Sequence, residues 1–256
     1  MNLVEYGKKN HLVTITMNRP EKYNALNPEL IAELRKAWIR YRDDDDAWLA
    51  ILTGAGPSFS AGADKAGFER WLKGEDTLGN HIKAIAQDPY WSGELEKPTI
   101  SAIKGYALGS GLDLALRADF RVAAESAKFA LPEVERGIIL ILWDNLPYAI
   151  AAELISGSTI DAQRAYQVGM VNRLVPDIQL MDAANALAEE LLSRPPLALH
   201  HALKLLRDMK KADVPTPRNL LEDYFVQLSK ELAKTEDFKE STLALLEKRK
   251  PVFKRT

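Results

Sequence analysis

The sequence predicts a protein of the α/β class, and three observations support this prediction. Short apolar, strand-like segments alternate with amphipathic helical patterns in the first part of the chain. Two glycine-rich turns each follow an apolar strand and lead into helix-like sequence. The last part of the chain is mostly helical in pattern. The chain has 256 residues, of which 46% are hydrophobic and 27% charged, enough for one large domain or two small ones.

The first three elements follow from residue spacing. The segment HLVTITM, His11 to Met17, alternates like a half-buried strand. A helix is expected from Asn27, because an Asn-Pro pair supplies an N-cap and a first-turn proline before apolar residues at helical spacing. The continuous apolar run from Leu49 to Leu52 then predicts a strand that is covered on both faces.

The same rhythm continues along the chain. Thr99 to Ala107 is expected to form one strand, the segment after Ser110 a helix, and Phe120 to Ala123 another strand. After Asp161 three segments carry an apolar stripe at helical spacing: 183–192, 197–209 and 220–232. The pair Pro195-Pro196 marks a boundary, so we expect an α/β core over residues 1–194 and a helical C-terminal module over 195–256.

Composition excludes several classes of function. The chain has no cysteine, which rules out disulfides and thiolate nucleophiles and suits a reducing compartment. Its four histidines lack metal-binding spacing, so no metal is expected. A formal net charge of -2 gives no reason to expect nucleic acid as a partner. No segment has the length and apolar character of a signal core or a membrane span, so we expect a cytoplasmic protein with no membrane partner.

The two glycine-rich turns share a design. They are GAGPSFSAGADKAGF, Gly54 to Phe68, and GYALGSGLDL, Gly105 to Leu114. Small residues let a ligand approach the backbone closely, and the first N–H groups of a helix have no internal acceptor. Two such N–H groups aimed at one point would form an oxyanion hole. Each turn taken alone is also compatible with an ordinary tight turn.

Two carboxylates accompany these turns. Asp113 lies within the apolar segment that follows the second turn, where burying a lone carboxylate is costly. Glu133 follows another apolar run and a proline, and could equally be a surface residue in a loop. The residues alone leave open whether the two acids meet.

Five stretches, in this order, resemble the crotonase, or enoyl-CoA hydratase/isomerase, superfamily. They are MNRPEKYNALNPEL (17–30), ILTGAGPSFSAGAD (51–64), KPTISAIKGYALGSGLDLALRADFRVAAESAKFALPEVERGI (97–138), ISGSTIDAQRAYQVGMVNRLVP (155–176) and LLEKRKPVFK (245–254). The resemblance covers nearly the whole chain. It implies a crotonase-type spiral of strand-strand-helix repeats, with a helical C-terminal module that builds trimers, often paired into hexamers.

The resemblance also implies a reaction. Family members stabilise the enolate of an acyl-CoA thioester with two backbone N–H groups, which fall here on Ala63 and Ser110. Family hydratases activate water with two glutamates, which align with Glu133 and Asp113, the latter one methylene shorter. We therefore expect hydration of an enoyl-CoA, or the reverse dehydration, with Glu133 as principal acid and base and Asp113 positioning water. The alternative is a double-bond isomerase in which Glu133 alone carries the proton.

The family's contacts with CoA map to two segments. They imply substrate binding by Lys22, Tyr23, Ala25, Ala61, Asp64, Lys65 and Ala66, although the two lysines could also be solvated surface residues. The tail lysines Lys248, Lys250 and Lys254 are weaker candidates for a neighbouring subunit's CoA. CoA enters as part of the substrate, so no separate cofactor is expected.

The chain also departs from the family pattern. Ile141 stands where family dienoyl-CoA isomerases have a further aspartate, and Trp143 and Asp144 replace glycines beside the expected acyl pocket. Trp143 and Trp91, from the insert PYW, could wall a pocket for a cyclic or aromatic acyl group, or could simply be core residues. Asp144 could be a third acid or a helix N-cap.

Two more remote alternatives come from other classes. An RNA-binding member would use the modest basic cluster of the first predicted helix, Arg35, Lys36, Arg40 and Arg42, which four aspartates follow at once. An inactive member would result if Asp113 and the altered loop had abolished the water site.

Overall fold

The computed structural model describes residues 2–73, 75, 87–133, 146–211, 227, 230–232 and 234–256. The chain divides into two compact units, residues 1–188 and 189–256. The first unit contains both glycine-rich turns and every strand found among the described residues. The sequence places its boundary slightly later, at Pro195-Pro196, and the assignment of the thioester site to the earlier part stays a prediction.

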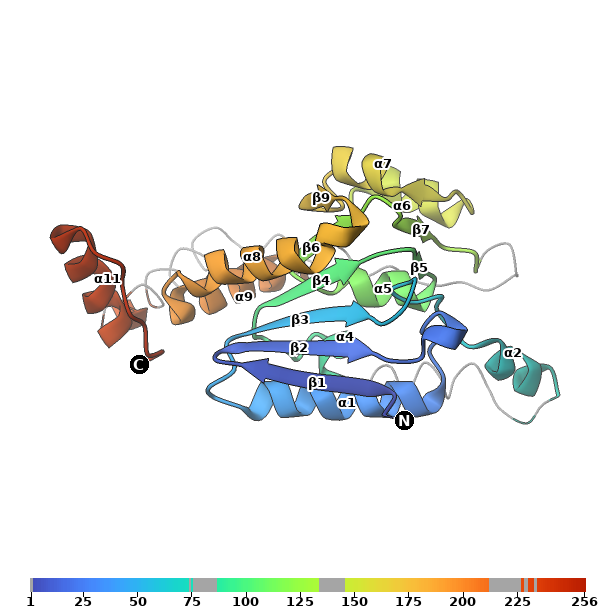
Figure 1. Cartoon of the computed structure of the whole chain (residues 1–256), viewed down its shortest axis with the longest axis horizontal. Helices are drawn as coiled ribbons and strands as arrows, with labels where there is room; N and C mark the ends of the chain where they lie inside the picture. The colour runs from blue at the N-terminus through green and yellow to red at the C-terminus, as the bar shows by residue number, and fades with distance from the viewer. Residues whose placement is uncertain are drawn as a thin grey trace. The chain divides into compact units, whose positions relative to one another are not determined.

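A six-stranded sheet forms the framework of the first unit. In spatial order its strands are β1 (Val4–Lys9), β2 (Leu12–Met17), β3 (Leu49–Gly54), β4 (Thr99–Ile103), β6 (Phe120–Ala124) and β9 (Arg173–Val175). Only β1 is antiparallel to its neighbour, and all the later pairs are parallel (Figure 1). The predicted strands at 11–17, 49–52 and 120–123 are confirmed. The mostly polar edge strand β1 lacks an apolar alternation and was not predicted.

A second, three-stranded sheet corrects one prediction. It consists of β5 (Tyr106–Leu108), β7 (Lys128–Ala130) and β8 (Ile160–Asp161). The single strand predicted from Thr99 to Ala107 is therefore wrong, because the chain leaves the large sheet after Ile103 and enters the small one at Tyr106. The break lies at Gly105, which has φ of +54° and where a Cβ would come within 2.2 Å of the Pro57 carbonyl oxygen.

Helices cover the sheets. Helix α1 (Pro28–Asp43) begins as predicted, with the Asn27 side chain accepting from Leu30 N at 2.9 Å. Figure 1 shows α1 running along one face of the large sheet, under β1 and β2. The remaining elements of the first unit are the 3-10 turns η1 (Pro20–Lys22) and η3 (Asp177–Gln179), α2 (Lys65–Leu72), α4 (Pro89–Ser92), α5 (Ser110–Leu116), α6 (Tyr148–Ile155), α7 (Ala162–Gln167) and α8 (Leu180–Leu192), whose last residues extend into the second unit.

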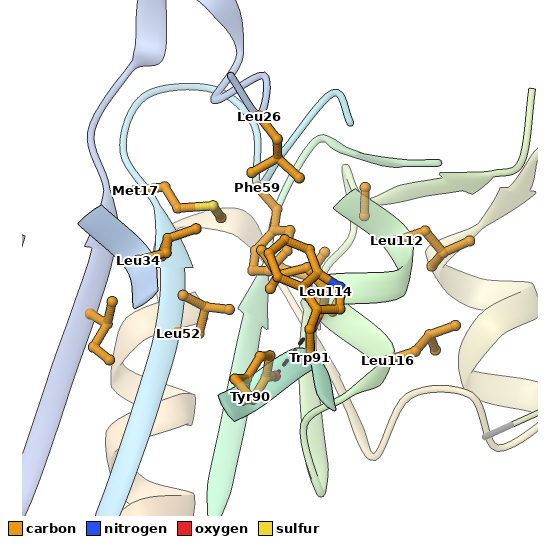
Figure 2. Packing of buried hydrophobic residues seen from close by; sticks show 14 of the residues in the cluster. Met17, Leu26, Leu34, Leu52, Phe59, Tyr90, Trp91, Leu112, Leu114 and Leu116 are labelled. Atoms are coloured by element: carbon orange, nitrogen blue, oxygen red, sulfur yellow. Dashed lines mark hydrogen bonds between the residues drawn. The ribbon is translucent and has the colours of Figure 1, made fainter. Parts of the chain in front are cut away.

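The core of the first unit brings the sheet together with α1, α4 and α5. Figure 2 shows its centre, where Met17 and Leu52 of the large sheet, Leu34 of α1 and Leu114 of α5 belong to one buried cluster. Aromatic contacts tie α1 to α4, because the rings of Trp38 and Tyr90 stack with centroids 4.2 Å apart. The core therefore fixes the position of α5, which carries the second glycine-rich turn.

The described part of the second unit consists mainly of helices, followed by an irregular C-terminal segment. It contains α9 (Pro196–Lys211), which confirms the helix predicted over 197–209, and α11 (Glu236–Glu247). Most of the helix predicted over 220–232 lies outside the described residues. The C-terminal segment folds back on α11, where the buried Asp237 carboxylate accepts from Lys254 N and Arg255 N, both at 2.8 Å. Within the described ranges, no helix is both long and apolar enough to cross a membrane.

Candidate active site

The first glycine-rich turn is tied to the segment before α1 by a short parallel bridge. Leu26 N donates to Gly62 O at 2.7 Å, and Asp64 N donates to Leu26 O at 3.2 Å. In a parallel bridge the residue between these two partners turns its own N–H and C=O to the opposite side. The N–H of Ala63 therefore points away from Leu26.

The second turn lies directly against the first. Ser60 N donates to Tyr106 O at 2.8 Å, and Leu108 N donates back to Ser60 O at 3.0 Å. Beyond this bridge the backbones approach so closely that a Cβ on Gly62 would lie 2.4 Å from Leu108 O and 3.5 Å from Ser110 N. Gly62 has φ of +83°, so both its conformation and its surroundings require glycine.

Two backbone donors thus come from neighbouring turns. Ser110 is the first residue of α5, after a Gly109 N-cap with φ of +52°, and a helix has no internal acceptor for its first N–H groups. Within the part of the chain that the structure describes, neither Ala63 N–H nor Ser110 N–H donates a hydrogen bond. These are the two N–H groups that the sequence predicts as an oxyanion hole. Both are available to bind an acceptor, and the loops that carry them are in contact.

Glu133 reaches the second turn because parallel strands end at the same edge of a sheet. Strands β5 and β7 are parallel, and Gly109 N donates to Ala130 O at 2.9 Å just beyond them. A Cβ on Gly109 would lie 2.0 Å from Glu133 Oε1. The Glu133 carboxylate therefore packs against the α-carbon of the residue that precedes Ser110, in the space that a side chain at residue 109 would take.

Asp113 lies one helical turn after Ser110, and the residue is only 6% exposed. Trp91 Nε1 donates to Asp113 Oδ2 at 2.8 Å, and Arg117 Nε lies 3.5 Å from Oδ1. Burial raises the pKa of Asp113, while the charge of Arg117 and the hydrogen bond from Trp91 lower it, and burial prevails. Neither partner was predicted from the sequence. The spacing of four residues between Asp113 and Arg117 is one at which helical side chains form ion pairs, so this contact could have been predicted. No spacing in the sequence indicates the contact between Trp91 and Asp113.

Asp64 supports the first turn. Its carboxylate pairs with the Arg19 guanidinium and accepts from Ala66 N at 2.8 Å, at the start of α2. Arg19 Nη1 also donates to Ala25 O at 3.0 Å, so it joins the two segments. Burial raises the pKa of Asp64, but the hydrogen bonds from Arg19 and Ala66 outweigh it and hold that pKa below its usual value. Asp64 was predicted to contact substrate, and its described partners are these backbone and guanidinium groups.

Asn24 is a second support that sequence analysis missed. It is fully buried with φ of +54°, and its Nδ2 donates to Ala55 O at 2.9 Å and to Ser58 O at 2.8 Å. Its Oδ1 accepts from Arg19 N at 2.9 Å. One amide side chain therefore fixes the segment before α1 against the first glycine-rich turn. Asparagine tolerates this left-handed conformation better than most residues, but a single sequence gives no sign of where such a residue is needed.

The other predicted site residues are distributed as follows. Lys22 and Lys65 are exposed, Tyr23 is half exposed and lies edge-on to Tyr106, and Ala61 N donates to Tyr23 O at 2.9 Å. Trp91 is buried in α4. Ile141, Trp143 and Asp144 lie outside the described residues, and the tail lysines belong to the second unit. No group of three or more potential metal ligands occurs among the described residues.

Comparison with known proteins decides the family. Residues 7–256 match the family model described as enoyl-CoA hydratase/isomerase. The chain belongs to this family. The match spans both glycine-rich turns, Asp113 and Glu133, so the arrangement just described lies within an enoyl-CoA hydratase/isomerase domain of the crotonase superfamily.

Relatives of this family member resemble it over nearly their whole length. Carnitinyl-CoA dehydratase of Escherichia coli K12 is 36% identical over 252 residues, which cover 95% of each chain. An enoyl-CoA hydratase from Bacillus anthracis has a similar structure, with a TM-score of 0.88, 31% identity and coverage of 99% of this chain and 100% of that one. The structure of an enoyl-CoA hydratase from Mycobacterium tuberculosis has a TM-score of 0.86 and 32% identity, with 100% of both chains covered. The crotonase-type α/β fold and membership of a lyase-type enzyme family are thereby confirmed.

Proposed function

We propose that this enzyme adds water across the C2–C3 double bond of an enoyl-CoA, or removes it from the corresponding 3-hydroxyacyl-CoA. The observation that carries the proposal is the position of the Glu133 carboxylate against Gly109, one residue before the Ser110 N–H. An acid next to a potential oxyanion donor suits proton transfer at a thioester enolate. The name of the E. coli relative, carnitinyl-CoA dehydratase, supports the same reaction type.

Each element of the site then has a defined task. The Ala63 and Ser110 N–H groups donate to the thioester oxygen as negative charge develops there. In hydration, Glu133 accepts a proton from the water whose oxygen bonds to C3 and returns that proton to C2 as the enolate collapses. In dehydration, Glu133 takes the C2 proton, the bond from C3 to the hydroxyl breaks, and Glu133 gives the proton to the departing hydroxyl, which leaves as water. Asp113 would hold the water or the hydroxyl group.

The substrate is proposed to bind as an acyl-CoA thioester, with no further cofactor. Its CoA part would lie along the backbone of the segments tied by Asn24 and Arg19, with Lys22 and Lys65 near phosphates. A cyclic or aromatic acyl group, considered above, stays a proposal for the acyl part. The remaining members of the proposed CoA-binding set are Tyr23, Ala25, Ala61, Asp64 and Ala66.

One observation favours a second candidate, an enoyl-CoA double-bond isomerase. The two oxygens of Asp113 face Trp91 and Arg117, respectively. If these contacts occupy the carboxylate fully, only Glu133 remains to carry a proton between C2 and C4. Such a one-acid site would move a double bond without adding water.

Oxygen labelling separates the two candidates. The enzyme is incubated with crotonyl-CoA or a 3-enoyl-CoA in water enriched in oxygen-18, and the products are analysed by mass spectrometry. Hydration predicts a labelled 3-hydroxyacyl-CoA from crotonyl-CoA. Conversion of the 3-enoyl-CoA to the 2-enoyl-CoA, without label in any product, would support the isomerase and contradict the hydratase.

Glu133→Gln tests the proton carrier. We expect it to lower kcat by about 10²- to 10⁴-fold, the usual contribution of general acid–base catalysis, while the affinity for acyl-CoA changes little. Glu125→Gln is the matched control, because Glu125 is an exposed glutamate of the same unit. Activity of the Glu133 variant within a few-fold of the control would overturn the assignment.

A further inference from the structure

Asp113 is held by a donor that the reaction as described so far does not use. Trp91 Nε1 donates to Asp113 Oδ2 at 2.8 Å, and both side chains are buried. Arg117 approaches the other oxygen from the next turn of α5. A buried carboxylate with a neutral donor on one oxygen and a cation beside the other is restricted to one orientation.

Helix α4 is itself docked so that the indole cannot easily move. The Asp88 carboxylate caps it by accepting from Tyr90 N at 2.8 Å. The Tyr90 hydroxyl donates to Leu114 O of α5 at 3.1 Å (Figure 2). Tyr90 and its neighbour Trp91 therefore both bind α5, one through the backbone and one through Asp113. Because two neighbouring residues contact the same helix, the Trp91 side chain is held in a defined position, as a functional site requires.

We propose that Trp91 is a positioning residue, which orients the Asp113 carboxylate so that its remaining acceptor positions hold the reacting water. The inference rests on the proposed function. A carboxylate offers about four acceptor positions, so the contacts with Trp91 and Arg117 leave capacity for a water molecule. The indole also explains how an aspartate can hold water where family hydratases have a glutamate. The fixed N–H donor sets the orientation of the aspartate side chain, which is one methylene shorter.

The first test compares two tryptophan variants. Trp91→Phe removes the indole donor and part of the ring. Trp48→Phe is the matched control, because Trp48 is also buried, stacks on His11 rather than on α4, and its Nε1 makes no hydrogen bond among the described residues. We expect Trp91→Phe to lower kcat for hydration by about 10- to 100-fold, the size of effect that a misplacement of about 1 Å produces, with KM within about twofold. Trp48→Phe should leave kcat within about threefold. Equal kcat values in the two variants would overturn the inference.

A second variant covers the case in which Trp91→Phe does not fold. Replacing Trp91 with 3-benzothienylalanine keeps the size of the ring system and removes only the N–H group. The same loss of kcat is expected. A benzothienylalanine enzyme with wild-type kcat would show that the indole only packs.

Proton exchange separates this inference from the proposed function. Exchange of the C2 protons of butyryl-CoA in heavy water requires the enolate site and Glu133 but no added water. The Trp91 variants should exchange within about threefold of wild type while hydrating slowly. A parallel loss of exchange and hydration would contradict a role confined to water. A wild-type enzyme that neither exchanges nor hydrates would overturn the proposed function and this inference together.

Discussion

Glu133 and Gly109 form the contact on which the proposed chemistry depends. The carboxylate occupies the space that a Cβ of residue 109 would need, at 2.0 Å from Oε1. The absence of a side chain at Gly109 therefore does two things, because it permits φ of +52° and it admits the acid to the turn. A side chain at residue 109 would be strained by the backbone conformation and would displace the neighbouring acid.

Gly109→Ala is expected to displace the Glu133 carboxylate and lower kcat by about 10²-fold. Gly169→Ala is the matched control, because Gly169 also has positive φ, +74°, but a Cβ there meets nothing within 4 Å. Both variants should lose about 1 kcal/mol of unfolding free energy from the unfavourable backbone conformation. Steady-state kinetics and urea unfolding of both test this. A Gly109 variant as active as the Gly169 variant would contradict the contact.

Asp88, the cap of α4, introduces a pH dependence of stability. It is fully buried, and burial raises its pKa from 3.8 to about 6, against the opposing hydrogen bonds from Tyr90 N and Trp91 N. Between these two values the folded state binds more protons than the unfolded state. The contribution of Asp88 to the free energy of unfolding therefore falls as the pH rises through this window.

Asp88→Asn removes this titration and keeps an amide oxygen that can accept the capping bonds. Raising the pH from 4 to 7 should lower the free energy of unfolding of wild type by about 2 kcal/mol more than that of the variant. Urea unfolding at the two pH values measures the difference. An identical pH dependence in both proteins would show that Asp88 does not titrate in this range.

At the scale of elements, Asn24 fixes the relative position of two loops, the segment before α1 and the first glycine-rich turn. Its side-chain amide donates to Ala55 O and Ser58 O and accepts from Arg19 N. Its backbone carbonyl accepts from Ser60 Oγ at 2.8 Å. These bonds place the segment before α1 beside the first glycine-rich turn, so the proposed oxyanion donor at Ala63 depends on an asparagine with no proposed chemical role.

Asn24→Ala should therefore be costly for both folding and catalysis. Two buried carbonyl groups lose their donor, and we expect a loss of about 2 to 4 kcal/mol in unfolding free energy. Asn10→Ala is the matched control, because Asn10 also has positive φ, +52°, but is exposed in the turn between β1 and β2. Urea unfolding should show a clearly smaller loss for the control. Equal losses would mean that only the backbone conformation matters.

Elements with a strong pattern could be predicted from the sequence. The alternation in β2, the apolar run of β3 and the Asn27 cap of α1 all depend on neighbouring residues, and each was located correctly. The division of residues 99–107 between β4 and β5 was missed, because apolar residues stand on both sides of the pair Lys104-Gly105 and hide the change of sheet. Strand β1 was missed because an edge strand is partly solvated and loses its apolar alternation.

At the scale of the molecule, the site combines segments that are far apart in the chain. The residues themselves indicated two turns and two acids, and the family resemblance assigned their roles. The residues could not show that Glu133 lies on Gly109 or that Trp91 binds Asp113, because both contacts depend on the packing of sheets and helices. Such pairs have no signature in local spacing.

The proposed assembly is also a property of the whole molecule. We propose a homotrimer or a pair of trimers, from the family resemblance and from apolar side chains that stand exposed in the first unit, among them Tyr148 at 89% and Ile178 at 90%. Light scattering coupled to gel filtration should give three or six times the chain mass of 28.6 kDa. A monomer at micromolar concentration would contradict this proposal.

Glu133 is proposed to move a proton at C2 of an acyl-CoA thioester beside the N–H groups of Ala63 and Ser110. Exchange of the C2 protons of butyryl-CoA in heavy water, followed by proton NMR, measures this step alone, because it needs neither a particular acyl chain nor the addition of water. Wild type and Glu125→Gln should both catalyse the exchange, and Glu133→Gln should lose it by about 10²-fold or more. Exchange by Glu133→Gln at the wild-type rate, or no exchange by wild type, would contradict this proposal.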